Sequence, residues 1–274
     1  EDRSVPENVN QVIWKGGREP FRWSNLAKLT LDFRRLTREI KPDLIHAGPI
    51  QTCAFVAVLS EFHPILTMSW GFDLMEDVHK SRWMQWVTEY VLRNTQFFTS
   101  DANVTKNKAV VYGMDPEKTV VFPWGVDLEH YSPKNWSPIT DNSFTLFCNR
   151  SWETRYGVDA LARAFTKVAH INPMVNLILL GGGSQGGTLR QIFNNGGVSE
   201  RVHFGGHIAQ KDLPYWYHQA DLYISPSHVD GSSVSLMEAL ACGLPCLVSD
   251  IPANREWVNE NNGWLFRDGD ANDL

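Results

Sequence analysis

The stretch that decides the fold spans residues 225–245 and reads SPSHVDGSSVSLMEALACGLP. It starts at the end of an apolar segment, Leu222–Ser225, passes through a turn of small residues and enters an apolar helical segment near Ser233. A strand that leads through such a turn into a helix predicts a β-α unit. Ligands of parallel α/β sheets lie at the carboxyl ends of strands, so this turn is a candidate site.

Working outward from this unit, strand-like and helix-like segments alternate along the whole chain. We predict strands at residues 43–46, 65–69, 97–99, 120–122, 144–148, 175–180, 202–204, 222–225, 244–249 and 264–266, with clear helical stripes at 26–40, 83–90 and 158–169. This alternation indicates β-α-β units and parallel sheets with helices on both faces. The fold class is therefore α/β, with two Rossmann-like parallel-sheet domains facing a cleft.

The two domains are separated by a change in composition. Residues 123–143 are rich in Pro, Gly, Asp and Asn and have no hydrophobic periodicity, which is typical of an interdomain connection. We place the domains at residues 1–135 and 136–274.

Composition and charge exclude several classes of protein. The chain has 274 residues, of which 43% are hydrophobic, so a disordered chain is excluded. The net charge is −6, and the first 137 residues carry 16 basic and 17 acidic side chains, so nucleic acid is not an expected partner. No apolar run is long enough for a transmembrane helix.

One segment, from Arg18 to Lys41, departs from this balance with seven basic residues against three acidic ones. It is either the solvated face of a helix or a surface that contacts an anionic acceptor or membrane headgroups.

The four cysteines favour a reducing compartment. Cys53, Cys148, Cys242 and Cys246 all lie in apolar runs, and their spacing fits neither a zinc site nor a disulfide framework. Buried free thiols are the expectation, which favours a cytoplasmic location.

The turn before the helix offers backbone N–H groups to an anion. Gly231, Ser232, Ser233 and Val234 stand at the start of the predicted helix, where N–H groups are unpaired and the helix dipole is positive. The alternative is an ordinary N-cap made by Asp230 or a serine.

Glu238 is the only charged residue from Leu236 to Val248. A carboxylate inside an apolar helix is costly unless it is hydrogen-bonded, and ligand hydroxyls can supply the partners. The alternative is a structural ion pair, with Arg255 as the partner.

Arginines and glycines follow other predicted strands. Arg150 comes directly after the strand 144–148, and Arg155 starts the next helix, where both suit a diphosphate or form surface salt bridges. The turns around Gly182 and Gly183, and before His207 and Ile208, let the backbone approach a ligand or are simply tight turns. Neither turn fits the dinucleotide-binding pattern of a dehydrogenase.

The ordered series of these motifs resembles the donor-binding domain of retaining glycosyltransferases of family 4, which have the GT-B fold. The resemblance rests on GVD at 125–127, the two arginines, LGGGS at 180–184, VHFG at 202–205, ADLYISPS at 220–227, DGSSVSLMEA at 230–239, GLP at 243–245 and NGWLF at 262–266. In the first part it rests on PDLIH at 42–46 and WGFD at 70–73.

The resemblance implies roles for matching positions. Glu238 would bind the nucleotide ribose, and Asp230 the donor sugar, although the family usually has Glu at that position and often Phe where Ser232 stands. Arg150 and Arg155 would neutralise the leaving diphosphate, with the amides of residues 231–234 completing the clamp. His207 and Ile208 would read the nucleobase.

On the acceptor side, Trp70 and Asp73 follow a predicted strand and are expected to line the cleft, with His46 as a competing candidate. Many relatives have a histidine where Trp70 stands. The exposed face of a tryptophan can stack on a sugar ring.

The implied reaction moves a sugar from a nucleotide-diphosphate sugar, with UDP-sugars preferred, to a hydroxyl of a glycan, a lipid-linked sugar or a small molecule, keeping the anomeric configuration. No cofactor or metal is expected, since arginines and amides can stabilise the diphosphate. The acidic pair Asp268 and Asp270 is interpreted as a turn. A nucleotide-sugar epimerase and a non-catalytic sugar-nucleotide-binding subunit are the alternatives. Peripheral contact with the inner membrane face through the basic segment is a further expectation.

The resemblance also makes the chain short for its family. The first β-α units of the acceptor domain and the terminal cross-over helices are expected to be missing, as in a shortened member or a fragment.

Overall fold

The computed structural model describes residues 8–12, 21–133 and 143–274. Contacts divide the chain into a first unit, Glu1–Ser100 with Thr105–Phe122, and a second unit, Asp101–Val104 with Pro123–Leu274. The predicted domain boundary at residue 135 and the Arg18 end of the basic segment lie outside the described residues, so both stay predictions.

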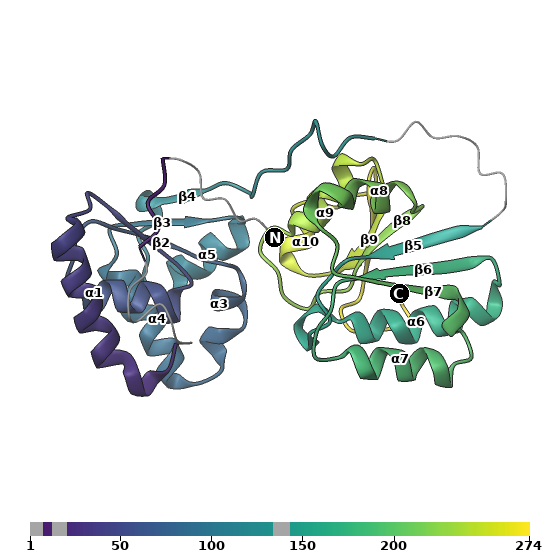
Figure 1. Ribbon diagram of the computed structural model, residues 1–274, viewed down its shortest axis with the longest axis horizontal. Helices are drawn as coiled ribbons and strands as arrows, with labels where there is room; N and C mark the ends of the chain where they lie inside the picture. Colours follow the sequence, from purple (N-terminus) through teal and green to yellow (C-terminus); the bar gives the residue numbers. More distant parts are fainter. Residues whose placement is uncertain (1–7, 13–20, 134–142) are drawn as a thin grey trace. The chain divides into compact units, whose positions relative to one another are not determined.

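The first unit is built around a parallel sheet with the order β1-β2-β3-β4 (Figure 1). Its helices lie between the strands in sequence, as the alternation predicts. Chain order gives α1 (Leu26–Ile40), β1 (Ile45–Ala47), a π-helical turn (Ile50–Ala54), α2 (Phe55–Leu59), β2 (Ile65–Met68), α3 (Phe72–Met75), α4 (Arg82–Asn94), β3 (Phe97–Ser100), α5 (Asn103–Val111) and β4 (Thr119–Val121).

Local sequence explains where the helices of this unit begin and end. The hydroxyl of Ser81 caps α4 by accepting the N–H of Met84 at 3.1 Å. Helix α1 ends at Lys41, whose left-handed backbone (φ 52°) precedes Pro42, a residue that disfavours helix before it. The predicted ends of α1 are therefore confirmed.

The second unit contains a larger parallel sheet with the order β10-β9-β8-β5-β6-β7 (Figure 1). Strand order reverses beside β5, because β6 and β8 pair with its two edges. The elements are β5 (Phe144–Cys148), α6 (Val158–Ile171), β6 (Val175–Leu180), α7 (Gly186–Asn195), β7 (Val202–Gly206), α8 (Leu213–His218), β8 (Leu222–Ser225), α9 (Val234–Ala241), β9 (Cys246–Ser249), α10 (Pro252–Arg255) and β10 (Gly263–Phe266).

Apolar side chains cover both faces of this sheet, as a doubly wound sheet requires. Leu177 and Leu179 point to the face that α6 and α7 cover, and Ile178 and Leu180 point to the face that α8 and α9 cover. The α/β class, the parallel sheets and the strand positions are thus confirmed, and the structure adds the helices α2, α3, α5, α7, α8 and α10, which the pattern did not resolve.

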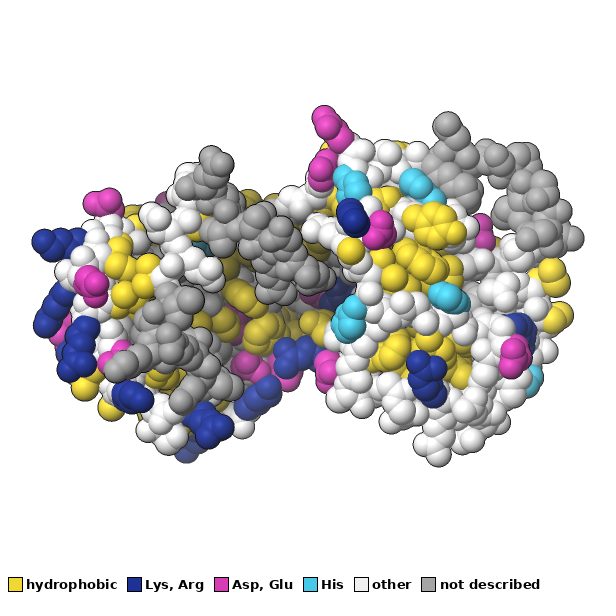
Figure 2. Space-filling view, in the orientation of Figure 1, with side chains coloured by type: hydrophobic (Ala, Val, Ile, Leu, Met, Phe, Trp, Pro, Cys, Tyr) yellow, Lys and Arg dark blue, Asp and Glu magenta, His cyan; other side chains and the backbone are white. Residues whose placement is uncertain are grey.

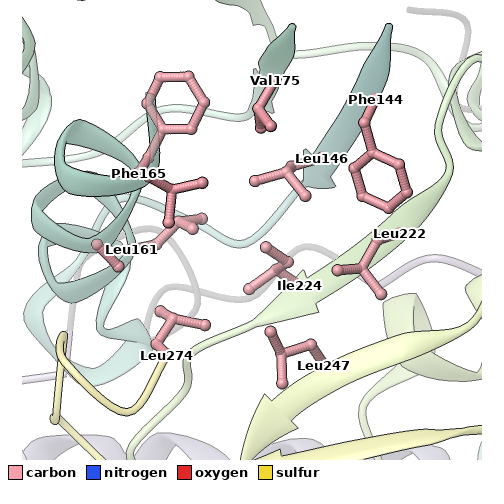
Figure 3. Close-up of a pocket in the computed structure, with 11 residues that line it drawn as sticks. Phe144, Leu146, Leu161, Phe165, Val175, Leu222, Ile224, Leu247 and Leu274 are labelled. Atoms are coloured by element: carbon pink, nitrogen blue, oxygen red, sulfur yellow. The ribbon is translucent and has the colours of Figure 1, made fainter. Parts of the chain in front are cut away.

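A hollow of about 230 Å³ remains on the α6 face of the sheet (Figure 3). Its lining is entirely apolar, with Leu146, Ile224 and Leu247 from the strands, Leu161 and Phe165 from α6, and Leu274 at its edge. Because the hollow offers no polar group, it does not suit a nucleotide.

The cysteine prediction is partly wrong. Cys148, Cys242 and Cys246 are buried and free, but Cys53 is exposed. It lies in the π-helical turn Ile50–Ala54, in which Ile50, Gln51 and Ala54 take the buried positions.

Candidate functional site

The candidate site lies where β5 and β8 end and α9 begins in the second unit. Arg150 follows β5 in the chain, and Ser233 is the N-cap of α9, with its hydroxyl 3.4 Å from the N–H of Leu236. Carboxyl ends of neighbouring parallel strands meet at one sheet edge, which explains why these distant residues come together.

The Arg150 guanidinium is the centre of this site. One terminal nitrogen donates to the hydroxyls of Ser233 at 2.8 Å and Ser235 at 3.0 Å, and the other donates to the Asp230 carboxylate at 2.6 Å. The guanidinium carbon lies 4.5 Å from the centre of the Tyr156 ring. Arginine, serines and the start of α9 therefore form one polar cluster.

Arg150 is buried but not saturated. Only 11% of its side chain is exposed, and its Nε is buried without a hydrogen-bond partner. Burial alone would lower the pKa of Arg150, but Asp230 raises it and the net shift is upward. A buried cation with one nitrogen that has no partner, beside the amides of a helix start, is suited to an anion.

Glu238 lies one turn into α9 and is only 5% exposed. Its carboxylate accepts a hydrogen bond from the hydroxyl of Tyr217 at 2.8 Å, and the Asn149 amide donates to that hydroxyl at 2.9 Å. Desolvation raises the pKa of Glu238, although the hydrogen bonds from Tyr217 and Tyr131 oppose the shift.

The alternative interpretation of Glu238 as an ion-pair partner of Arg255 is wrong. Arg255 pairs with Asp250, with a distance of 2.5 Å from Nε to the carboxylate. Asp250 lies five positions before Arg255 in the chain, so this nearby acid is the ion-pair partner of the arginine.

The turn residues before α9 have partners of their own. The N–H of Gly231 donates to the side chain of Asp230 at 3.1 Å, and the N–H of Ser232 donates to the carboxylate of Asp101 at 2.7 Å. The Ser232 hydroxyl also donates to the Asp101 carbonyl at 2.6 Å. A carboxylate thus occupies one of the amides expected to bind a donor.

Asp101 is a residue that the sequence interpretation missed. It belongs to the second unit by its contacts, accepts the indole N–H of Trp124 at 3.1 Å, and has a pKa raised mainly by burial. Its position directly after β3 was the available signal, since it is an acid at a strand end.

Arg155 lies in a short turn of 3-10 helix, Thr154–Tyr156. Its carbonyl accepts the N–H of His228 at 2.9 Å, and its charge helps to lower the pKa of Glu153, after the hydrogen bonds from Ser184. The side chain of Arg150 contacts the start of α9, whereas the backbone of Arg155 contacts the loop after β8 at His228.

The glycine turns behave as close approaches between backbone segments. A Cβ on Gly182 would lie 2.8 Å from the ring of His207, and a Cβ on Gly183 would lie 2.6 Å from the Trp152 carbonyl. His207 is exposed, and Ile208 packs on the core beneath α8 and α9. At the start of α7 the carboxylate of Glu153 accepts the N–H of Ser184 at 2.8 Å.

In the first unit, Asp73 is completely buried. Its oxygens accept the hydroxyl of Ser69 at 2.6 Å and the N–H groups of Ile50 at 3.1 Å, Trp70 at 3.2 Å and Leu74 at 3.0 Å. Burial raises its pKa from 3.8 to about 6, despite these hydrogen bonds. The carboxylate therefore holds the loop after β2 together.

The other two acceptor-side candidates are exposed. Trp70 is 51% exposed, and a Cβ on Gly48 would lie 3.1 Å from its indole nitrogen. His46 is the middle residue of β1, rather than the strand-end residue expected from the sequence, and its side chain is exposed.

Within the described ranges, no three His, Cys, Asp or Glu side chains are grouped as a metal site would require. Asp268 and Asp270 form a turn, as expected, in which Asp268 contacts the His228 ring at 2.6 Å and Asp270 pairs with Arg267 at 3.1 Å. Among the described helices, none has both the length and the hydrophobicity to cross a bilayer.

Two family descriptions match the chain. Residues 143–274 match "Glycosyl transferases group 1", and residues 1–102 match "Glycosyl transferase 4-like". The chain belongs to the family 4 glycosyltransferases of the GT-B fold. The two matches fall on either side of the composition change at residues 123–143.

Two curated relatives of this chain are named for inositol-containing acceptors. It is 26% identical over 168 residues to a GDP-mannose-dependent monoacylated alpha-(1-6)-phosphatidylinositol monomannoside mannosyltransferase of Corynebacterium glutamicum, covering 56% of this chain and 44% of that protein. It is 29% identical over 176 residues to a D-inositol 3-phosphate glycosyltransferase of Xylanimonas cellulosilytica, covering 58% and 41%. The aligned part is less than half of either relative.

Solved structures share the fold of the glycosyltransferase chain. HepE of Anabaena in complex with UDP superposes with a TM-score of 0.75 at 23% identity, covering 91% of this chain and 71% of HepE. Sucrose-phosphate synthase of Thermosynechococcus elongatus gives a TM-score of 0.80 at 20% identity, covering 100% and 75%. None of these four proteins is named as an epimerase.

Proposed function

We propose that this chain carries out retaining, metal-independent transfer of a sugar from a nucleotide-diphosphate sugar to an acceptor hydroxyl. The observation that carries the proposal is Arg150, a buried guanidinium at a strand end with an unpartnered Nε and two contacts to the start of α9. Charge develops on the diphosphate as the sugar leaves, and a preorganised cation with helix amides stabilises that charge.

In the proposed complex, the diphosphate takes over part of the Arg150 contact that Asp230 holds at 2.6 Å. Asp230 is then available to accept hydroxyl hydrogens of the donor sugar. Arg155 and the amides of Ser233 and Val234 add positive potential, so no metal ion is required for neutralisation.

Glu238 is proposed to accept the ribose hydroxyls. The Tyr217 hydroxyl donates to its carboxylate at 2.8 Å, and the Asn149 amide donates in turn to that hydroxyl at 2.9 Å, which fixes the carboxylate near the start of α9. Gly182, Gly183, His207 and Ile208 are proposed to frame the base and the diphosphate from the β6 and β7 ends.

Retention of configuration follows if the acceptor attacks on the face that the diphosphate leaves. A phosphate oxygen then accepts the proton of the acceptor hydroxyl, while the bond from the anomeric carbon to the diphosphate breaks and the new glycosidic bond forms. The protein's part is to orient the reactants and to stabilise the leaving charge.

The similar proteins are named with different donor nucleotides and different acceptors. HepE is described with UDP and with UDP-glucose, whereas the Corynebacterium relative is named as GDP-mannose-dependent. UDP-sugars are the first donors to test, with a glycan, a lipid-linked sugar or a small polyol as acceptor.

Peripheral contact with a membrane is proposed for the described part of the basic segment. Figure 2 shows Lys and Arg side chains gathered over α1 in the first unit. Arg34 and Arg35 pair with Glu61 at 2.8 Å and with Asp32 at 3.6 Å, and Lys28, Arg38 and Lys41 add to the positive face. Such a face is attracted to anionic headgroups on the cytoplasmic side.

The test is transfer from UDP-glucose, UDP-N-acetylglucosamine and GDP-mannose to inositol, inositol 3-phosphate and a simple glycan. A product whose anomeric proton coupling matches that of the donor supports retention, and unchanged rates in EDTA support metal independence. Interconversion of donor sugars without acceptor would indicate an epimerase. Nucleotide binding without transfer would indicate a non-catalytic subunit.

A further inference from the structure

A second groove in the second unit lies at the opposite ends of the strands from Arg150. It has a volume of about 470 Å³ and is bounded by the first residues of β5, β6 and β7 and by α8. The side chains that matter for the argument are Asn176, Glu200, Arg201, His203, Tyr215 and Trp216. Because the candidate donor site is at the carboxyl ends, this groove is not part of it.

Three aromatic rings form one wall of the groove. The rings of His203 and Trp216 are stacked, with centroids 5.2 Å apart and planes 19° apart. The Tyr215 ring stands nearly perpendicular to Trp216, at 5.5 Å and 84°. In Figure 2, hydrophobic and histidine side chains lie side by side on the second unit where Figure 1 draws α8.

The exposure of these rings is unusual for a structural cluster. Tyr215 is 61% exposed, and the stacked pair reaches the groove instead of being closed over by other side chains. Aromatic rings with one apolar face and a polar edge are enriched where a ligand is partly apolar and partly hydrated. The apolar C–H face of a pyranose ring fits that description.

Polar side chains surround the rings with mixed hydrogen-bonding capacity. The Asn176 amide donates to the Met174 carbonyl at 3.3 Å, and Arg201 donates to the Asn172 carbonyl at 3.2 Å, which leaves their remaining donors for a ligand. Across the parts of the chain that the structure describes, the side-chain amide of Gln219 and the carboxylate of Glu200 have no hydrogen-bond partner. Hydroxyl groups both donate and accept, so such a mixed set suits them.

The charge of the groove selects against anions. Glu200 and Arg201 are the only lining residues with a formal charge, and their charges cancel. A nucleotide or a phosphate would find no excess of cations there, in contrast to the Arg150 cluster. The volume is within the range of small-molecule sites.

We propose that this groove is a second carbohydrate-binding site, which takes a neutral oligosaccharide with one sugar ring packed on the His203–Trp216 face. The proposal does not depend on the transfer reaction, because it concerns binding at the other end of the sheet. Its consequence for an enzyme of this kind would be to hold a glycan away from the donor site.

The experiment measures binding of maltotriose, mannotriose and chitotriose to the whole chain by saturation-transfer NMR and calorimetry. At least one trisaccharide is expected to bind, with its ring C–H protons nearest the protein. Tyr215→Ala and His203→Ala are each expected to weaken that binding about tenfold, because a ring contact contributes up to about that factor. Tyr215→Phe keeps the ring and is expected to leave the binding unchanged.

Two controls identify the place of binding. Trp264→Ala removes a tryptophan that is 62% exposed on β10, at the other edge of the same sheet, and should not change the affinity. Saturating UDP should not displace the trisaccharide. No binding by any trisaccharide, displacement by UDP, or equal weakening by Trp264→Ala would overturn the proposal.

Discussion

Each unit has a buried charged side chain shortly after the end of a parallel strand, and the two side chains are used differently. In the second unit the buried charge is Arg150, whose Nε has no partner. In the first unit it is Asp73, whose two oxygens accept hydrogen bonds from Ser69, Ile50, Trp70 and Leu74. Arg150 therefore has a hydrogen-bond donor left for a ligand, whereas the acceptor capacity of Asp73 is used by groups of the protein itself.

This difference distinguishes a candidate ligand-binding position from one that supports the fold. A strand-end location alone does not make a residue part of a site, because both residues have it. The deciding quantity is the hydrogen-bonding capacity that remains after the protein has used its share. By this criterion Asp73 supports the loop that carries Trp70, and Arg150 is the candidate for binding a ligand.

The largest effect is expected from Arg150→Ala. Loss of the guanidinium removes the cation from the proposed diphosphate site and leaves the partly buried Asp230 without its partner, so turnover should fall by about 100-fold or more. Steady-state transfer rates with a fixed donor measure the effect. Arg163→Ala removes an exposed arginine paired with Asp159 and should leave the rate unchanged. A loss of less than about tenfold in Arg150→Ala would remove the central role of this residue.

Glu238→Ala is expected to lower kcat/KM for the donor by about 100-fold, because the ribose hydroxyls lose their acceptor while Tyr217 loses its partner. Glu238→Gln keeps an acceptor for Tyr217 and should lose less. Glu260→Ala, an exposed acid of the same unit, is the control. Near-normal kinetics in Glu238→Ala would show that the nucleotide binds elsewhere.

Asp73 is expected to affect stability and its pH dependence. Burial raises its pKa from 3.8 to about 6, so between these values the folded protein holds a proton that the unfolded chain has lost. The free energy of unfolding should therefore fall as pH rises from about 4 to 6, by up to about 3 kcal/mol from this group, and level off above that range.

Urea unfolding of the wild type and Asp73→Asn at pH 4.5 and 7 measures this effect. The variant does not titrate at this position, so the wild type should lose stability relative to it as pH rises. Asp43→Asn, an exposed acid in the same unit, should follow the wild type. Parallel profiles for wild type and Asp73→Asn would contradict the interpretation of Asp73.

The smallest effect is expected from Trp70→Ala. If the exposed indole contacts the acceptor, the acceptor KM should rise by a few fold to about tenfold while donor affinity stays the same. Trp83→Ala is the matched control, since Trp83 is 48% exposed in the same unit and belongs to a different aromatic cluster. A change in donor affinity with Trp70→Ala would place the residue in the donor site instead.

The sequence predicted the strands of both sheets because parallel strands are short apolar runs between helices. It also predicted that one sheet edge carries Arg150, Asp230, Ser233 and Glu238, because the carboxyl ends of parallel strands meet there. These residues carry charges or hydroxyls within apolar surroundings, which is a signal that one sequence can show.

Three features could not be predicted because they depend on contacts distant in sequence. Asp101 reaches Ser232 across 131 residues, and the partner of Glu238 is Tyr217 instead of Arg255. The complete burial of Asp73 depends on Ile50, 23 residues away. Hydrophobic periodicity assigns a residue to a face but not to a hydrogen-bond partner.

The most direct test compares nucleoside diphosphate with nucleoside binding by calorimetry. UDP, GDP and ADP identify the preferred base, and the matching nucleoside then lacks only the phosphates. The wild type is expected to bind the diphosphate at least about 100-fold more tightly, a difference of about 2.7 kcal/mol. Arg150→Ala should abolish that difference without weakening the nucleoside. An unchanged preference for the diphosphate in Arg150→Ala would contradict the account.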